Sequence, residues 1–264
     1  MLDRAHYINQ KLSIEFELGI LLGRKNPITI FEIGACEGED SIKYARFFPK
    51  ATIYAFEPLP DNISLIEANY LKYGIANARI FNKALSDKNG TATFFVSDGR
   101  PPDAVDSDWD YGNKSSSLLA PSKHLEAAAF ISFDKKIEVE TITISTFCKQ
   151  EKLNDIDFIH MDVQGAELMV LQGAEEFIAS IKVIWLEVSI IDYYKDQPLA
   201  SDVKKFMDKN GFVLLKDDVN GMQGDQMFVS KIFYTRFYIF RISKLILFKS
   251  ILSRILRKLK LINS

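Results

Sequence analysis

Residues 28–43 read ITIFEIGACEGEDSIK, and this stretch decides the fold. The run 28–31 of β-branched and aromatic residues lies between Pro27 and Gly34, as in a buried parallel strand. Gly34 and Gly38 then permit a tight turn and a close approach of the backbone to a ligand, toward which the first amides of a following helix would point. The stretch predicts a strand, a glycine turn and a helix, although two such glycines also occur in ordinary turns.

A second apolar run, 51–56, ends in Glu57, which comes 23 residues after Gly34. In nucleotide-binding α/β folds an acid at this place accepts hydrogen bonds from the two ribose hydroxyls. A dinucleotide site would show three glycines, whereas Cys36 and Glu37 crowd this turn. Acids around the turn would repel phosphates and favour a cation, such as the sulfonium of S-adenosylmethionine. These acids are Glu32, Glu37, Glu39 and Asp40.

The chain has 264 residues and 47% hydrophobic side chains, enough to bury one sizeable core. Its net charge of −2 is unevenly placed, because residues 232–264 hold eight Lys or Arg and no acid, which leaves −10 on the first 231 residues. The parts we expect are one α/β domain at 1–231, with an N-terminal helix in 1–27 and a substrate-side insertion at 97–136, and a basic tail at 232–264.

The cellular compartment is predicted from what the sequence lacks. Cys36 and Cys148 have neither the spacing of a metal site nor that of a disulfide framework. The first residues do not resemble a secretory signal, and no stretch offers 18 uncharged apolar residues. We therefore expect a cytoplasmic protein.

Helix and strand patterns alternate along the chain, which predicts a mostly parallel sheet with helices on both faces. Helices are expected at 2–23, 41–48, 61–74, 145–152, 166–181 and 202–210. Strands are expected at 28–33, 51–57, 78–81, 91–96, 137–143, 157–161 and 182–187, with a hairpin of 212–215 and 226–229.

Polar residues or glycines stand at the ends of five predicted strands: Gly34, Glu57, Asn82, Asp162 and Glu187. Ligands of open α/β sheets bind beyond the carboxyl ends of the strands, so we predict the binding site at this edge.

Periodicity is lost in the insertion 97–136, where Trp109 and Tyr111 stand among five Asp residues. Acids that bond hydroxyls, beside rings that stack on the C–H face of a sugar, would suit a carbohydrate. A mobile polar loop explains the same pattern equally well.

Together, several motifs resemble the FkbM family of S-adenosylmethionine-dependent methyltransferases over roughly residues 28–217. They are FEIGA at 31–35, AFEP at 55–58, NKALSD at 82–87 with Gly90, SSL at 116–118 and DVQGAE at 162–167. The resemblance implies a class I methyltransferase fold, with seven strands and a final antiparallel hairpin, and methyl transfer to a hydroxyl, often of a sugar or polyketide. The family usually has Lys and Glu where this chain has His160 and Gln164. We expect cofactor binding to survive both departures.

The expected site follows from these motifs and strand ends. S-adenosylmethionine is expected against Glu32, Gly34, Ala35, Gly38, Ser41, Glu57, Pro58, Asn82, Ala84 and Asp162. A sugar or glycan acceptor is expected against Trp109, Tyr111, Ser116 and Ser117. A sugar hydroxyl needs a base, for which Asp162 is the first candidate, ahead of His160 and Glu187. A buried structural histidine is the alternative for His160. We predict no metal, although Asp162, Glu167 and Glu187 could converge on a divalent ion.

Two rival functions remain open. An NAD-dependent oxidoreductase shares the acid after the second strand, but the turn sequence argues against it. A catalytically silent scaffold with this fold is compatible with His160 and Gln164.

The basic tail carries an apolar stripe at helical spacing, formed by Phe248, Ile251, Leu252, Ile255, Leu256 and Leu259. We expect 248–260 to lie on an anionic surface, at the inner face of the cytoplasmic membrane, near a lipid-linked glycan acceptor. Packing on the domain or on a second subunit is the alternative, so a homo-oligomer stays open. Nucleic acid is not an expected partner.

Overall fold

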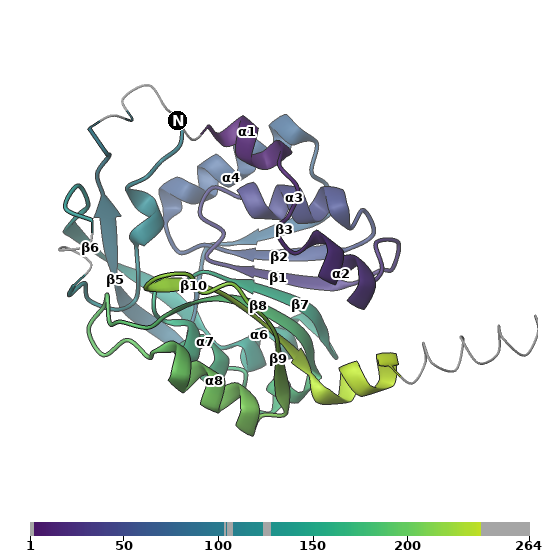
Figure 1. Ribbon diagram of the computed structural model, residues 1–264. Coiled ribbons are helices and arrows are strands. Elements are labelled where there is room, and N and C mark those ends of the chain that lie inside the picture. Colours follow the sequence, from purple (N-terminus) through teal and green to yellow (C-terminus); the bar gives the residue numbers. More distant parts are fainter. Residues whose placement is uncertain (1–2, 103, 105–107, 124–127, 239–264) are drawn as a thin grey trace, which may run out of the picture.

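The computed structural model describes residues 3–102, 104, 108–123 and 128–238, which form an α/β fold with two sheets (Figure 1). The larger sheet has seven strands, in the order β3-β2-β1-β7-β8-β10-β9. Their bounds are β1 Thr29–Ile33, β2 Thr52–Phe56, β3 Ala78–Phe81, β7 Ile156–Met161, β8 Ile181–Ser189, β9 Phe212–Asp217 and β10 Gln223–Ser230. Neighbouring strands are parallel except β10, which is antiparallel to both β8 and β9. This arrangement confirms the expected sheet and its final hairpin.

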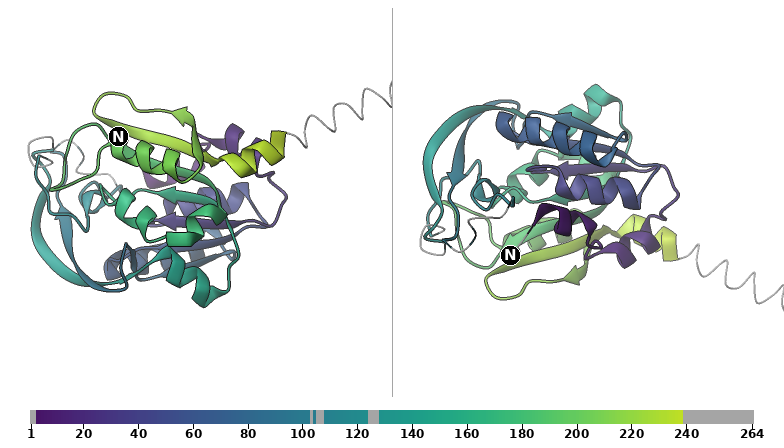
Figure 2. Two further views of the ribbon diagram at one scale, coloured as in Figure 1. Left: turned by 90° about the horizontal axis from the view of Figure 1, so that it is seen from below. Right: turned by 90° about the horizontal axis from the view of Figure 1, so that it is seen from above.

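Helices cover both faces of the large sheet (Figures 1 and 2). One face carries α1 Arg4–Asn9, α2 Glu15–Leu21, α3 Glu39–Phe47 and α4 Pro60–Tyr73. The other carries α6 Ile144–Glu151, α7 Glu167–Gln172, the 3-10 helix η2 Glu175–Ser180 and α8 Ala200–Lys209. Alternation along the strands divides the core between these faces: Ile30 of β1 packs with the first group, and its neighbour Phe31 packs with the second.

A smaller sheet of three strands, in the order β4-β6-β5, lies beside the carboxyl edge of the large one (Figure 1). Its strands are β4 Ala84–Leu85, β5 Gly90–Asp98 and β6 Ser132–Ile142. The loop between β5 and β6 contains the 3-10 helix η1 Asn113–Ser115. The expected insertion 97–136 therefore begins in the end of β5 and ends in the start of β6.

Two expected helices are each divided in the structure. The helix expected at 2–23 is interrupted between α1 and α2, where Leu12 and Ile14 both turn into the core. The helix expected at 166–181 ends at Gln172, before Gly173, where the backbone of Ser86 lies so close that an added Cβ would be 2.0 Å from the Ser86 carbonyl oxygen. In both places tertiary packing overrides helical periodicity.

Residues 231–238 continue as a helix after β10, and Phe233 and Phe237 pack against the core. The apolar stripe expected at 248–259 lies outside the described residues. No helix within the described part of the chain is both long and apolar enough to cross a membrane.

Candidate active site

The turn after β1 joins three strand ends. Gly34 has φ +84°, and a Cβ there would lie 1.9 Å from the backbone oxygen of Asp162, which follows β7. The amides of Gly34 and Ala35 both donate to the carbonyl oxygen of Phe56 at the end of β2. The close approach of the chain after β7 thus requires glycine at position 34, whether or not a ligand binds there.

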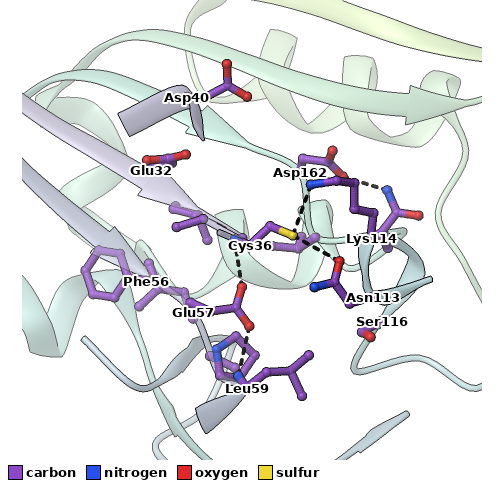
Figure 3. Close-up of a pocket in the computed structure, with 18 of the residues that line it drawn as sticks. Glu32, Cys36, Asp40, Phe56, Glu57, Leu59, Asn113, Lys114, Ser116 and Asp162 are labelled. Carbon is purple, nitrogen blue, oxygen red and sulfur yellow. Dashed lines mark hydrogen bonds between the residues drawn. The ribbon is translucent and has the colours of Figure 1, made fainter. Parts of the chain in front are cut away.

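Glu57 faces this turn from the end of β2. Its two carboxylate oxygens accept the amide hydrogens of Cys36 and Leu59, each at 2.8 Å (Figure 3). Burial raises the pKa of Glu57 to about 7, although these two amide donors lower it. A carboxylate has about four acceptor positions, so each oxygen can still accept a hydrogen bond from a ligand hydroxyl.

The main cavity, of about 950 Å³ with its open mouth, lies at the carboxyl edge between the two sheets. On the side of Glu57 its wall is largely apolar, with Pro58, Leu85, Phe94 and Leu118. A flat heterocycle fits such a wall.

The opposite side of the main cavity is acidic. Ligand atoms of Glu32, Asp40 and His160 lie within 4.8 Å of one another. Glu32 is 2% exposed, and its Oε2 has no hydrogen-bond partner among the described residues. The hydroxyl of Tyr7, from α1, donates to both oxygens of Asp40, at 2.9 and 3.0 Å. Burial and the neighbouring acids Asp40 and Glu39 raise the pKa of Glu32 well above its usual value, so this side would accept a cationic group.

Lys114, from η1, reaches the glycine turn from the smaller sheet. Its ammonium lies 3.3 Å from the sulfur of Cys36 and 3.4 Å from Glu39, and 4.2 Å from the ring centre of Trp109. Burial raises the pKa of the Cys36 thiol despite this ammonium, so Cys36 is a neutral thiol at pH 7 rather than a nucleophile.

Asp162 and Glu187 are connected through Gln164. The Nε2 of Gln164 donates to Asp162 at 2.7 Å and to Glu187 at 3.0 Å, and its Oε1 accepts the hydroxyl of Tyr194 at 3.2 Å. Although Asp162 is exposed toward the cavities, desolvation by the surrounding protein atoms raises its pKa, an effect that Gln164 and His160 oppose. A glutamate at 164 would offer no such donor to the two acids. The departure from the family motif is therefore matched to its surroundings.

A second cavity, of about 870 Å³ with its mouth, adjoins the main one. Lys114, Asp162 and Gln164 line both cavities, whereas Glu187 lines only the second. Asp162 thus stands between the two spaces.

The structure brings most of the expected residues to the main cavity. These are Glu32, Gly34, Ala35, Glu57, Pro58, Ala84, Trp109, Ser116, His160 and Asp162. Tyr7, Asn113 and Lys114 also line it, and the sequence did not single them out, since only tertiary contacts bring them there.

Five expected ligand-binding residues do not line the main cavity, each for a visible reason. Gly38 begins α3 and lies against Ile66 and Tyr70, and Ser41 is fully buried within α3. The amide of Asn82 donates to the carbonyl oxygens of Glu57 and Pro58.

Tyr111 and Ser117 are the other two. Ser117 is fully buried, and its hydroxyl donates to the backbone oxygen of Gln164. Tyr111 lies in the loop before η1, between Trp109 and Asn113, but does not itself line either cavity.

Glu167, weighed as a metal ligand, instead supports the turn after β7. Its Oε1 accepts the amide hydrogens of Val163 and Gly165, at 3.1 and 3.2 Å. Among the described residues, the side chains close enough to share one ion are Glu32, Asp40 and His160, not the alternative set with Glu167 that the sequence left open.

Comparisons with known proteins identify the family. The model of the methyltransferase FkbM domain matches residues 32–214. The 2-O-methyltransferase NoeI of Sinorhizobium fredii is 32% identical over 215 residues, 81% of this chain and 84% of that protein. Methyltransferase 1 of Beauveria bassiana is 23% identical over 150 residues, 56% of this chain and 58% of that protein. Among solved structures, M. capricolum TrmK with S-adenosylhomocysteine aligns with a TM-score of 0.44 and 12% identity, over 84% of this chain and 70% of that one. The chain therefore belongs to the FkbM methyltransferase family and is an S-adenosylmethionine-dependent methyltransferase.

Proposed function

We propose that this enzyme transfers the methyl group of S-adenosylmethionine to a hydroxyl group of a sugar. The observation that carries the proposal is the position of Asp162, a carboxylate that lines both the main cavity and the adjoining polar one. The 2-O-methyltransferase named above, similar over most of its length, supports oxygen as the methylated atom.

The main cavity fits the cofactor in one orientation. Glu57 would accept the ribose hydroxyls, and the apolar wall with Pro58 and Ala84 would hold the adenine. The methionine end, with its ammonium group, would then lie toward the acidic side formed by Glu32 and Asp40. Gly34 and Ala35 keep the backbone close to the ligand between these two ends.

Asp162 acts as the base in this proposal. The acceptor oxygen attacks the methyl carbon in line with the carbon–sulfur bond, an O–CH₃ bond forms, and the sulfonium leaves as a neutral thioether. The hydroxyl proton passes to the Asp162 carboxylate. Positioning supplies most of the rate, and the raised pKa of Asp162 makes it a stronger base.

Calorimetric titration together with an assay of S-adenosylhomocysteine release tests the proposal. S-adenosylmethionine should bind and NAD should not, and a panel of methyl hexosides should stimulate S-adenosylhomocysteine release. Binding of S-adenosylmethionine without release of S-adenosylhomocysteine on any sugar would support the silent scaffold, whereas binding of NAD would support the oxidoreductase.

The proposal extends to the setting of the reaction. The basic segment 248–260, with its apolar stripe, supports a lipid-linked acceptor and attachment to an anionic membrane surface, and a homo-oligomer would bury the same stripe. Co-sedimentation with anionic vesicles separates these two cases: the full chain should bind at low salt, and a chain ending at Ser230 should not. Equal binding to the vesicles by both chains would exclude a role of the tail in membrane attachment.

A further inference from the structure

The second cavity is a polar chamber built from the end of β8, the start of β10 and the segment around Tyr194. Its floor is Gly165, with φ +94°, on which the side chain of Gln197 lies so closely that a Cβ would meet it at 3.0 Å. The Oε1 of Gln197 in turn accepts the amide hydrogen of Tyr194 at 3.1 Å. The wall is thus held in place by hydrogen bonds before a ligand binds.

Glu187 is the acid of this chamber and is fixed from two sides. Its Oε2 accepts from Gln164 at 3.0 Å, and its Oε1 accepts from Gln223 at 3.2 Å. Each oxygen keeps acceptor capacity, and the amide oxygen of Gln223 is a further acceptor. Planar acid and amide groups side by side can bond two neighbouring hydroxyls of one ring.

The charges of the second cavity disfavour an anionic ligand. Among the described residues that line it, Asp162 and Glu187 are acidic and Lys114 is the one cation. The ammonium of Lys114 is directed to Cys36 and Glu39 at the main cavity. A carboxylate or phosphate on the ligand would therefore lose its water without gaining a cationic partner.

Trp109, which we expected to stack on the acceptor, does not line this chamber. It lies in the wall of the main cavity, where the centre of its ring is 5.0 Å from the ring centre of Tyr7. The aromatic residues of the second cavity are Tyr193 and Tyr194. The hydroxyl hydrogen of Tyr194 is already engaged within the protein, since the hydroxyl donates to the Ser115 carbonyl oxygen at 2.7 Å and to the Oε1 of Gln164.

We propose that the second cavity is the acceptor site and takes an uncharged sugar ring, whose neighbouring hydroxyls bond Glu187 and Gln223 while a third hydroxyl lies against Asp162. This inference rests on the proposed methyl transfer. Gln164 then has a positioning role, because its amide holds Asp162 and Glu187 at fixed places on either side of the acceptor. The acceptor enters through this cavity, and the cofactor occupies the main one.

The test uses the full chain saturated with S-adenosylhomocysteine and probes sugars by saturation-transfer NMR and calorimetry. The probes are methyl hexosides and the hexuronates of the same ring configuration. At least one methyl hexoside should bind, and its hexuronate should bind at least about tenfold more weakly. Gln223→Ala, at an exposed position, should weaken hexoside binding about tenfold. Gln172→Ala, an exposed glutamine at the end of α7, is the matched control and should change nothing.

The outcomes separate this inference from the proposed function. If S-adenosylhomocysteine binds but no hexoside does, or if Gln223→Ala behaves like Gln172→Ala, the acceptor site is elsewhere and the methyltransferase proposal stands. If the hexuronate binds as well as the hexoside, the restriction to uncharged sugars is wrong. If S-adenosylhomocysteine itself does not bind, the proposed function fails.

Discussion

Lowering the pH through 7 should weaken cofactor binding through Glu57. The carboxyl is 5% exposed and its pKa is about 7, because burial opposes its ionisation. Ribose hydroxyls can donate to both oxygens only when the group is ionised, since a protonated carboxyl gives up acceptor capacity. S-adenosylmethionine should therefore select the ionised form and displace a proton as it binds.

The size of the effect follows from the pKa. With a pKa of about 7, roughly one molecule in eleven carries an ionised Glu57 at pH 6 and about ten in eleven at pH 8. If only the ionised form binds, the affinity rises about tenfold over this range. In Glu57→Gln, loss of one charge-assisted contact, about 1.5 kcal/mol at least, should weaken binding about tenfold or more at pH 8 and remove Glu57's share of the pH dependence.

Isothermal titration calorimetry with S-adenosylmethionine measures both quantities. Titrations at pH 6, 7 and 8, in buffers of different ionisation enthalpy, give the dissociation constant and the number of protons released. Glu67→Gln, at an exposed position of α4, is the matched control and should keep the wild-type profile. A dissociation constant for Glu57→Gln equal to wild type at pH 8, with the same pH profile, would refute the assignment of Glu57 to the ribose.

Three further changes test other parts of the site. Asp162→Asn should lower turnover about a hundredfold or more while the cofactor dissociation constant stays within about threefold, because the substitution keeps the size of the side chain and removes its basicity. Near-normal turnover would indicate that His160 or Glu187 is the base instead. Gly34→Ala should lower the free energy of unfolding by several kcal/mol, because its Cβ would lie 1.9 Å from a backbone oxygen. Gly74→Ala, with φ +67° and open space around it, should cost only about 1–2 kcal/mol, and equal losses in urea denaturation would contradict the steric account. Glu57 and Glu167 have folded pKa values of about 7, against 4.5 for an ordinary glutamate. Between these two values the folded state therefore binds more protons than the unfolded state. The free energy of unfolding without ligand should fall as the pH rises from about 5 to 8, by up to about 1.4 kcal/mol per pH unit for each of the two carboxyl groups. Urea denaturation across that range should show a shallower slope in Glu57→Gln.

Local patterns were sufficient to predict the strands of the large sheet and the acid at the end of β2. The strand 78–81 matches β3 residue for residue, and the apolar runs before Gly34 and Glu57 correspond to β1 and β2. In each case the signal is contained in a few consecutive residues, because a buried parallel strand is a continuous apolar run. The hairpin of β9 and β10 was likewise marked by its Asn220-Gly221 turn.

Contacts between distant segments could not be predicted in the same way. Lys114 lies 78 positions from Cys36 in the chain, yet the two side chains are 3.3 Å apart. Tyr7 of α1 bonds Asp40 at the start of α3, 33 positions away, and the expected N-terminal helix is divided after α1. Both Lys114 and Tyr7 are common surface residues, and nothing in their sequence neighbourhood marks them as parts of a cavity.

The departure from the family motif at Gln164 is explained by its hydrogen bonds in the structure. From the sequence alone, an amide in place of the usual acid was compatible with a silent scaffold. In the structure the amide donates to both Asp162 and Glu187, and Tyr194 fixes its orientation by donating to its oxygen. A third carboxylate at this place would face two others without a donor between them, which raises the cost of ionising any of them. In the proposed mechanism the amide would keep Asp162 able to ionise beside the cofactor, so the substitution is compatible with Asp162 as an active base.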